Sequence, residues 1–181
     1  MQTQASLVSD VSDVAASEDP LAEIDRLMEK RSDDVRRSAD RSAQLLADRS
    51  EFSAEFATIC EQQVRPPMQA IIERLRRNGG GGLIEETVED PSRHPGHRLT
   101  LWMSLNGEIA GSPSPDLHPY LQLHTDVNKR CVVVSEGDMW QGHGGSRSGK
   151  IGEWWLSEIT AGRVTNEALD ILRRSVGEPT T

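Results

Sequence analysis

The sequence predicts an α+β fold: a long N-terminal coiled-coil helix, then a small antiparallel sheet of four to five strands packed with a short helix and a C-terminal helix. Two observations predict it. From Pro20 to Gln63 apolar residues recur every three or four positions, the period of an amphipathic helix. From Leu83 onward the period falls to two, which is typical of strands, and strands in an uninterrupted run pair antiparallel.

Residues 1–18 are predicted to be a disordered acidic tail. Residues 1–20 carry four acidic residues and no basic one, with only scattered Val and Leu among Ser, Asp, Gln and Ala. This composition buries too little apolar surface to offset the entropy of ordering. The tail ends at Asp19-Pro20, a favourable helix start, because Asp can cap a free backbone N–H and Pro loses no hydrogen bond in the first turn.

Residues 19–65 are predicted to form a coiled-coil helix. With Leu21 at heptad position a, one frame holds for about six heptads, and eight of its thirteen a and d sites are apolar, against roughly five expected from the composition. Such a repeat predicts a partner helix, and we expect a homodimer. The seam residues assigned to dimerisation are Leu21, Ile24, Met28, Val35, Leu45, Phe52, Phe56 and Ile59.

Residues 66–177 are predicted to form the globular α+β domain, and residues 178–181 a short tail. Pro66-Pro67 interrupts the first helix, because proline lacks the N–H donor and clashes with the preceding turn. A short amphipathic helix then buries Met68 and its neighbours at helical spacing. Four glycines, Gly79–Gly82, are interpreted as a flexible connector that ends the helical half.

Five segments of the domain have strand character. In the clearest, Leu99, Leu101 and Met103 alternate with residues that face the other way. A glycine-rich stretch, Gly142–Gly149, is interpreted as a flexible loop before the last strand. Apolar residues at helical spacing from Val164 onward predict the C-terminal helix. The strand segments are residues 83–88, 98–105, 120–124, 131–135 and 151–156.

Composition excludes several classes of protein. The net charge is -9, and the globular half is acidic, which disfavours a nucleic-acid-binding surface. No apolar run approaches the ~20 residues that cross a bilayer, and the N-terminus lacks the pattern of a secretory signal. Cys60 and Cys131 make no disulfide framework, which suits a reducing compartment. We therefore expect a soluble, cytoplasmic protein.

Two motifs come close to known chemistry, and neither is complete. Gly144–Lys150 matches most of a phosphate-binding loop, but Ile151 stands where that motif needs Ser or Thr, and no βα unit surrounds it. His94 and His97 could bracket a metal ion, yet the histidine and cysteine spacings match no strong zinc signature. We predict neither a cofactor nor a metal site.

The function predicted is that of a non-enzymatic dimeric interaction protein, an adaptor, regulator or assembly subunit, that presents a sheet surface to another protein. Trp102, Trp154 and Trp155 are the predicted partner-binding residues, since Trp side chains often dominate interface energies. One alternative is an acidic chaperone-like binder of a partner protein. Another is a small ligand-binding or hydrolytic domain, in which His124, Glu136 and Asp138 share acid and base roles.

Overall fold

The computed structural model describes residues 20–90, 95–140 and 145–177. The chain divides into two compact units, residues 1–43 and 44–181. In the first unit, all the described residues, 20–43, are helical and belong to α1, which spans Pro20–Ile59. The tail predicted over residues 1–18 lies outside the described part of the chain. The described helices include none long and apolar enough to span a membrane.

The second unit begins with three consecutive helical segments. The last part of α1 leads into a single π-helical turn, Cys60–Val64, and then into α2, Arg65–Arg77, whose first turn contains proline. The Arg65 N–H donates to the Cys60 carbonyl, five residues back. The predicted interruption at Pro66-Pro67 therefore takes the form of a π turn, because prolines in the first turn cannot donate to the carbonyls behind them.

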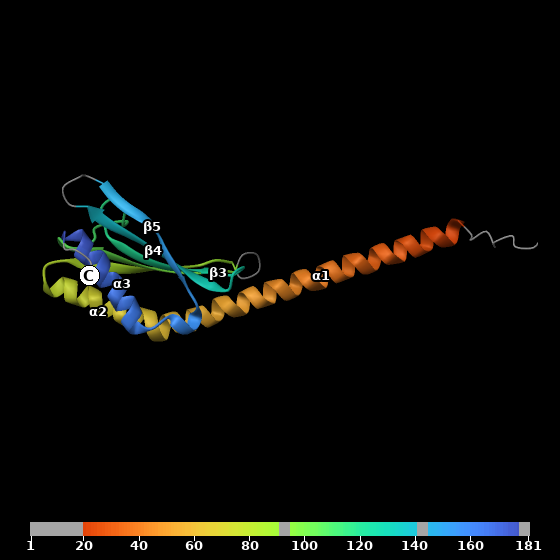
Figure 1. Ribbon diagram of the computed structural model, residues 1–181, viewed down its shortest axis with the longest axis horizontal. Helices are drawn as coiled ribbons and strands as arrows, with labels where there is room; N and C mark the ends of the chain where they lie inside the picture. The colour runs from red at the N-terminus through yellow and green to blue at the C-terminus, as the bar shows by residue number, and fades with distance from the viewer. Residues whose placement is uncertain (1–19, 91–94, 141–144, 178–181) are drawn as a thin grey trace, which may run out of the picture. The chain divides into compact units, whose positions relative to one another are not determined.

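Five antiparallel strands form one sheet in the order β1-β2-β3-β4-β5 (Figure 1). The structure confirms the α+β class and the upper end of the predicted strand number. A 3₁₀ turn, Leu156–Glu158, then leads to α3, Ala161–Ser175, capped at its N-terminus by Thr160. The strands are β1 Gly81–Val88, β2 His97–Ser104, β3 Tyr120–Asp126, β4 Cys131–Trp140 and β5 Gly145–Trp154.

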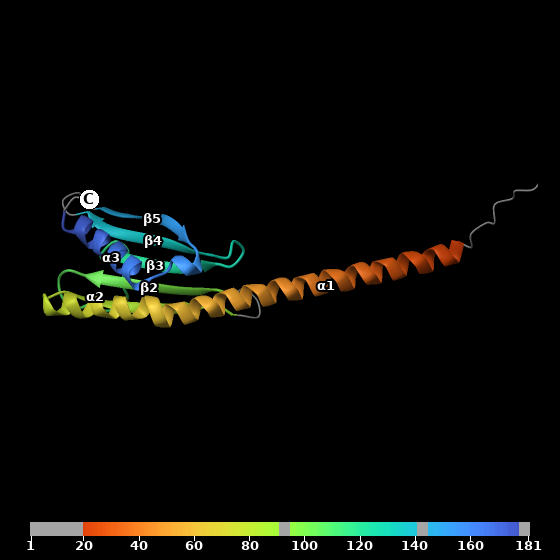
Figure 2. The ribbon, with the colours of Figure 1, turned by 60° about the horizontal axis from the view of Figure 1, so that its bottom comes forward.

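The hydrophobic core lies between one face of the sheet and the helices (Figure 2). α2 packs against β1 and β2, and α3 packs against β3 and β4. Alternate residues of the central strands point to this face, as the alternation in the sequence predicts. The buried core side chains are Leu99, Leu101, Met103, Leu121, Leu123, Val132, Val134 and Trp154 from the strands, Phe52, Phe56, Cys60, Val64, Met68, Ile72, Val164, Ala168 and Ile171 from the helices, and Ile159 from the segment before α3.

Two glycine-rich segments differ from the predictions. Gly81 and Gly82 belong to β1, and a Cβ atom on Gly82 would lie 2.7 Å from the Trp102 carbonyl oxygen. These glycines therefore allow close packing of backbone, and the interpretation as a connector is wrong for Gly81 and Gly82, whereas Gly79 and Gly80 do lie between α2 and β1. Residues 145–149, predicted as loop, are the start of β5 and pair with β4.

The compact unit that contains the sheet begins at Gln44, whereas the predicted globular domain began at residue 66. The difference is the segment 44–65. Its apolar side chains Phe52, Phe56 and Cys60 are buried in the core of the second unit, residues 44–181, which we call the sheet unit.

Candidate functional site

One face of the sheet carries mostly polar and aromatic side chains and lies opposite the helix-covered core. Strand pairing places Trp102, Tyr120 and Gly137 in one row across three strands, and Thr100 and Gln122 in the next. We call this surface the polar face. Its described members on β1 to β3 include Leu83, Glu85, Thr87, Arg98, Thr100, Trp102, Tyr120, Gln122 and His124.

Trp102 is held in place on the polar face by its neighbours. Its indole Nε1 donates to Glu85 Oε2 at 2.9 Å, and its ring centroid lies 5.0 Å from that of Tyr120. Trp102 lies on the face opposite Leu101 and Met103, as the alternation predicts, but only 8% of it is exposed. The indole therefore helps to build this surface, and most of its area is covered within the chain.

A cavity of about 310 Å³ opens beside these rings. Gln122 Nε2 donates to Thr100 Oγ1 at 3.2 Å, and both residues line the cavity. The cavity offers a carboxylate, a guanidinium, an amide and hydroxyl groups next to aromatic and proline rings. It therefore suits a polar ligand group better than an apolar one. Its lining is Glu85, Thr87, Arg98, Thr100, Trp102, Pro113, Pro115, Tyr120 and Gln122.

The other two predicted partner-binding tryptophans lie elsewhere. Trp154 is 2% exposed in the helix-covered core, and the Arg163 guanidinium lies 4.2 Å from its ring centroid. Trp155 follows β5 and is 58% exposed, and its backbone N–H donates to Glu158 Oε2. The structure therefore does not bring the three tryptophans together on one surface.

The predicted seam of α1 has two parts that differ in burial. The side chains at the first five apolar a and d sites are between 54% and 67% exposed, whereas Phe52 and Phe56 are fully buried in the core of the sheet unit, and Ile59 packs partly against it. We call the exposed part the free seam. It consists of Leu21, Ile24, Met28, Val35 and Leu45.

The residues of the predicted hydrolytic site are not assembled. His124 lies on the polar face, and burial, with the nearby Arg98 guanidinium, lowers the pKa of its imidazole. Glu136 lies on the opposite face, where it forms an ion pair with Arg174 of α3. The side chain of Asp138 lies outside the described part of the structure. Among the described residues, then, His124 and Glu136 are separated by the sheet.

The two near-motifs also have defined places. Gly145–Lys150 lies within β5, and the strand continues through Ile151, so the helix required after a phosphate-binding loop does not follow. His94 and Gly144 are outside the described ranges. Within those ranges, no group of three or more His, Cys, Asp or Glu side chains is arranged to hold a metal ion.

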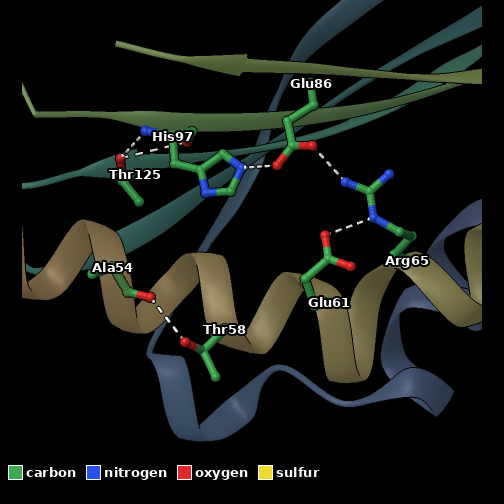
Figure 3. Close-up of polar contacts among 7 residues, drawn as sticks. All are labelled: Ala54, Thr58, Glu61, Arg65, Glu86, His97 and Thr125. Atoms are coloured by element: carbon green, nitrogen blue, oxygen red, sulfur yellow. Dashed lines mark hydrogen bonds and ion pairs between the residues drawn. The ribbon is translucent and has the colours of Figure 1, made fainter. Parts of the chain in front are cut away.

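A chain of four charged or titratable side chains, which the sequence pattern does not predict, links the helices to the sheet (Figure 3). His97 Nε2 lies 2.6 Å from Glu86 Oε1, Glu86 Oε2 is 2.5 Å from Arg65 Nη2, and Arg65 Nε donates to Glu61 Oε1 at 2.8 Å. The side chain of His97 is 3% exposed, and its backbone N–H donates to Thr125 Oγ1. Because these partners are distant in sequence, no local spacing could reveal them.

The linked side chains Glu61, Arg65, Glu86 and His97 have the properties of a structural contact and not of a reactive site. Burial acts to raise the pKa of the Glu86 carboxyl, but hydrogen bonds from His97 and Arg65 outweigh it and hold the pKa below its usual value. Burial, reinforced by the Glu86 carboxylate, raises the pKa of the Cys60 thiol to about 12. Cys60 is therefore a protonated thiol at neutral pH and lacks the thiolate form that a cysteine nucleophile needs.

No protein-family model matches the chain, and neither a curated protein nor a solved structure matches it. Its function is therefore argued from its own residues.

Proposed function

We propose that the protein is a non-enzymatic homodimer that associates through the free seam of α1 and presents the polar face of its sheet to another protein, as an adaptor, regulator or assembly subunit. The observation that carries the proposal is the exposure of five large apolar side chains at a and d positions of one helix. Both cysteines are buried free thiols, which is consistent with the reducing environment of the cytoplasm, where we place the protein.

The free seam needs a partner for a physical reason. Isolated helices owe little stability to propensity alone and most of it to packing of an apolar face. The intrahelical ion pairs of this segment, such as Glu23–Arg26 and Asp33–Arg36, are exposed and worth only about 0.3–0.5 kcal/mol each. Burial of the seam against a second helix provides the larger stabilisation, at about 25 cal/mol per Å² of apolar surface.

The double substitution Ile24→Asp with Met28→Asp tests the dimer. We expect the wild-type protein to show twice the chain mass in light scattering and the variant to show the mass of one chain, because carboxylates cannot be buried in the layers of a coiled coil without a large penalty. Thermal unfolding of the sheet unit should not change, since neither residue belongs to its core.

A matched control adds the same charge away from the seam. Ala22 and Ala43 both occupy heptad position b and are exposed. Ala22→Asp with Ala43→Asp should leave the dimer intact. A monomeric wild-type protein, or a seam variant that keeps the dimer mass, would reject the proposal.

The polar face supports the second half of the proposal. The described helices α2 and α3 pack on the other side of the sheet, and the polar face combines a fixed Trp–Tyr pair with hydrogen-bonding side chains and charges of both signs. Interfaces between proteins are enriched in aromatic residues and Arg at their centres and use polar groups to set specificity.

The substitution Arg98→Glu tests this surface, since Arg98 is exposed and lines the cavity of the polar face. We expect proteins that co-purify with the wild-type dimer to be depleted about tenfold with the variant, which corresponds to about 1.4 kcal/mol. Arg77→Glu, an equal charge reversal on an exposed position of α2, serves as the control. Quantitative mass spectrometry of both purifications gives the comparison; equal recovery with both variants would count against the polar face.

A further inference from the structure

Polar residues occupy the a and d positions between the apolar residues of the free seam, and these polar residues decide which way two helices can pack. In the heptad frame that begins at Leu21, Arg31, Ser38 and Ser42 occupy d, d and a positions between the apolar residues. In a parallel pair each of these residues would face its own copy, because a layers and d layers pair like with like. Three of the eight layers from Leu21 to Leu45 would then be purely polar, and one of them would set Arg31 against Arg31.

An antiparallel pair removes this conflict, because each a residue packs in the same layer as a d residue of the partner. When residue numbers in a layer sum to 66, every polar residue meets an apolar one. Arg31 then faces Val35 instead of a second Arg31. The remaining layers join Met28 with Ser38, Ile24 with Ser42, and Leu21 with Leu45.

The burial of the later seam residues sets where the paired segment ends, in whichever direction the partner runs. Phe52 and Phe56 continue the a and d series, but their side chains are already covered by the core of their own sheet unit. In the antiparallel register the layers begin at Leu21 and end at Leu45, so the pair uses the free seam completely and requires nothing beyond it.

We infer that the two α1 helices of the dimer run antiparallel, with residue i of one chain beside residue 66 − i of the other. This inference rests on the proposed dimer and specifies its geometry. Because the sheet unit follows residue 43 in each chain, the antiparallel direction attaches the two sheet units to opposite ends of the paired segment.

Disulfide trapping in the full-length protein tests the direction. Met28→Cys and Ser38→Cys are made as two single variants, each oxidised alone and as an equal mixture after exchange of chains. In the antiparallel register, identical positions are ten residues apart along the axis, about 15 Å, and a disulfide needs Cα atoms within about 7 Å. Cross-linked dimer should therefore form only in the mixture, where Met28→Cys of one chain meets Ser38→Cys of the other.

The native cysteines do not interfere, because Cys60 and Cys131 are both buried, and oxidised wild-type protein provides that control. Ala43→Cys, at an outward b position, should not cross-link to itself. Cross-linking of either seam variant with itself would overturn the antiparallel direction, and so would a dimer that cross-links in none of the samples. A wild-type protein with the mass of one chain in light scattering would instead reject the proposed dimer itself, so the two failures are distinguishable.

Discussion

At the scale of single residues, the polar face depends on a glycine, Gly137, whose lack of a side chain leaves room for a neighbouring ring. A Cβ atom on Gly137 would lie 2.3 Å from Tyr120 Cε1, because the tyrosine ring crosses directly over the glycine. With the ring in that position, Trp102 packs beside it and donates to Glu85. Gly137 therefore sets the position of both aromatic rings, although glycine in a strand is ordinarily unfavourable.

A second feature that depends on single residues is the set of linked side chains Glu61, Arg65, Glu86 and His97. His97 is almost fully buried, next to Phe56, and its Nε2 has a carboxylate as partner. Glu86 links that imidazole to Arg65 of α2. A buried polar group that loses its partner costs more than the bond itself contributes, so Glu86 is the member of the chain on which the others depend.

Replacing Glu86 with Gln tests this role. The free energy of unfolding at pH 7 should fall by about 1 kcal/mol, a value kept small because the carboxylate is partly exposed. The folded-state pKa of Glu86 lies below its unfolded value. Its contribution is therefore present above the unfolded pKa and lost as the pH falls through the folded one.

Urea unfolding at neutral and acidic pH measures this effect. The difference between wild type and Glu86→Gln should shrink as the pH falls into the carboxyl range. Glu55→Gln makes the same change of charge at an exposed helical position and should have little effect at either pH. A wild type and Glu86→Gln variant of equal stability at pH 7 would show that the carboxylate does not stabilise the fold.

At the scale of elements, α1 shows what periodicity can and cannot predict. The spacing of apolar residues correctly predicts a helix that includes both Leu21 and Phe56. The same spacing cannot tell whether a seam faces another helix or the chain's own sheet, because both bury one stripe of a helix. Phe52 and Phe56 look like continuations of the free seam in sequence, and only the tertiary structure shows them in the sheet core.

The strands show a similar division. The alternation in β2 predicts which residues face the core, and it correctly separates Trp102 from Leu101. The starts of β1 and β5 were missed, because glycine-rich sequence is typical of loops, whereas here Gly82 packs against backbone and Gly149 pairs with Glu136. The backbone that requires glycine at position 82, at Trp102, is distant in sequence. The cavity of the polar face was missed for the same reason, since its lining comes from three strands and a loop.

At the scale of the whole molecule, the boundary between the two units decides which part of the helix the sheet needs. All the buried core residues lie at position 52 or later, and the described residues 20–43 contribute none. The segment 44–65 supplies Phe52, Phe56, Cys60 and Val64 to that core. The sheet unit should therefore tolerate removal of everything before residue 44, but not of the helical segment that follows.

Two truncated chains test this boundary. A protein of residues 44–181 should fold as a monomer, with a thermal midpoint close to that of the full chain, because it keeps the whole core and loses most of the free seam. A protein of residues 66–181 should not fold. It loses two buried Phe side chains, each worth about 3–5 kcal/mol even when replaced by Ala, from a total stability that is typically about 5–15 kcal/mol. Circular dichroism measures the folding of each truncated protein, and light scattering measures its mass. A folded 66–181 protein would show that the helical segment only covers the sheet. An unfolded 44–181 protein would show that the first unit stabilises the second.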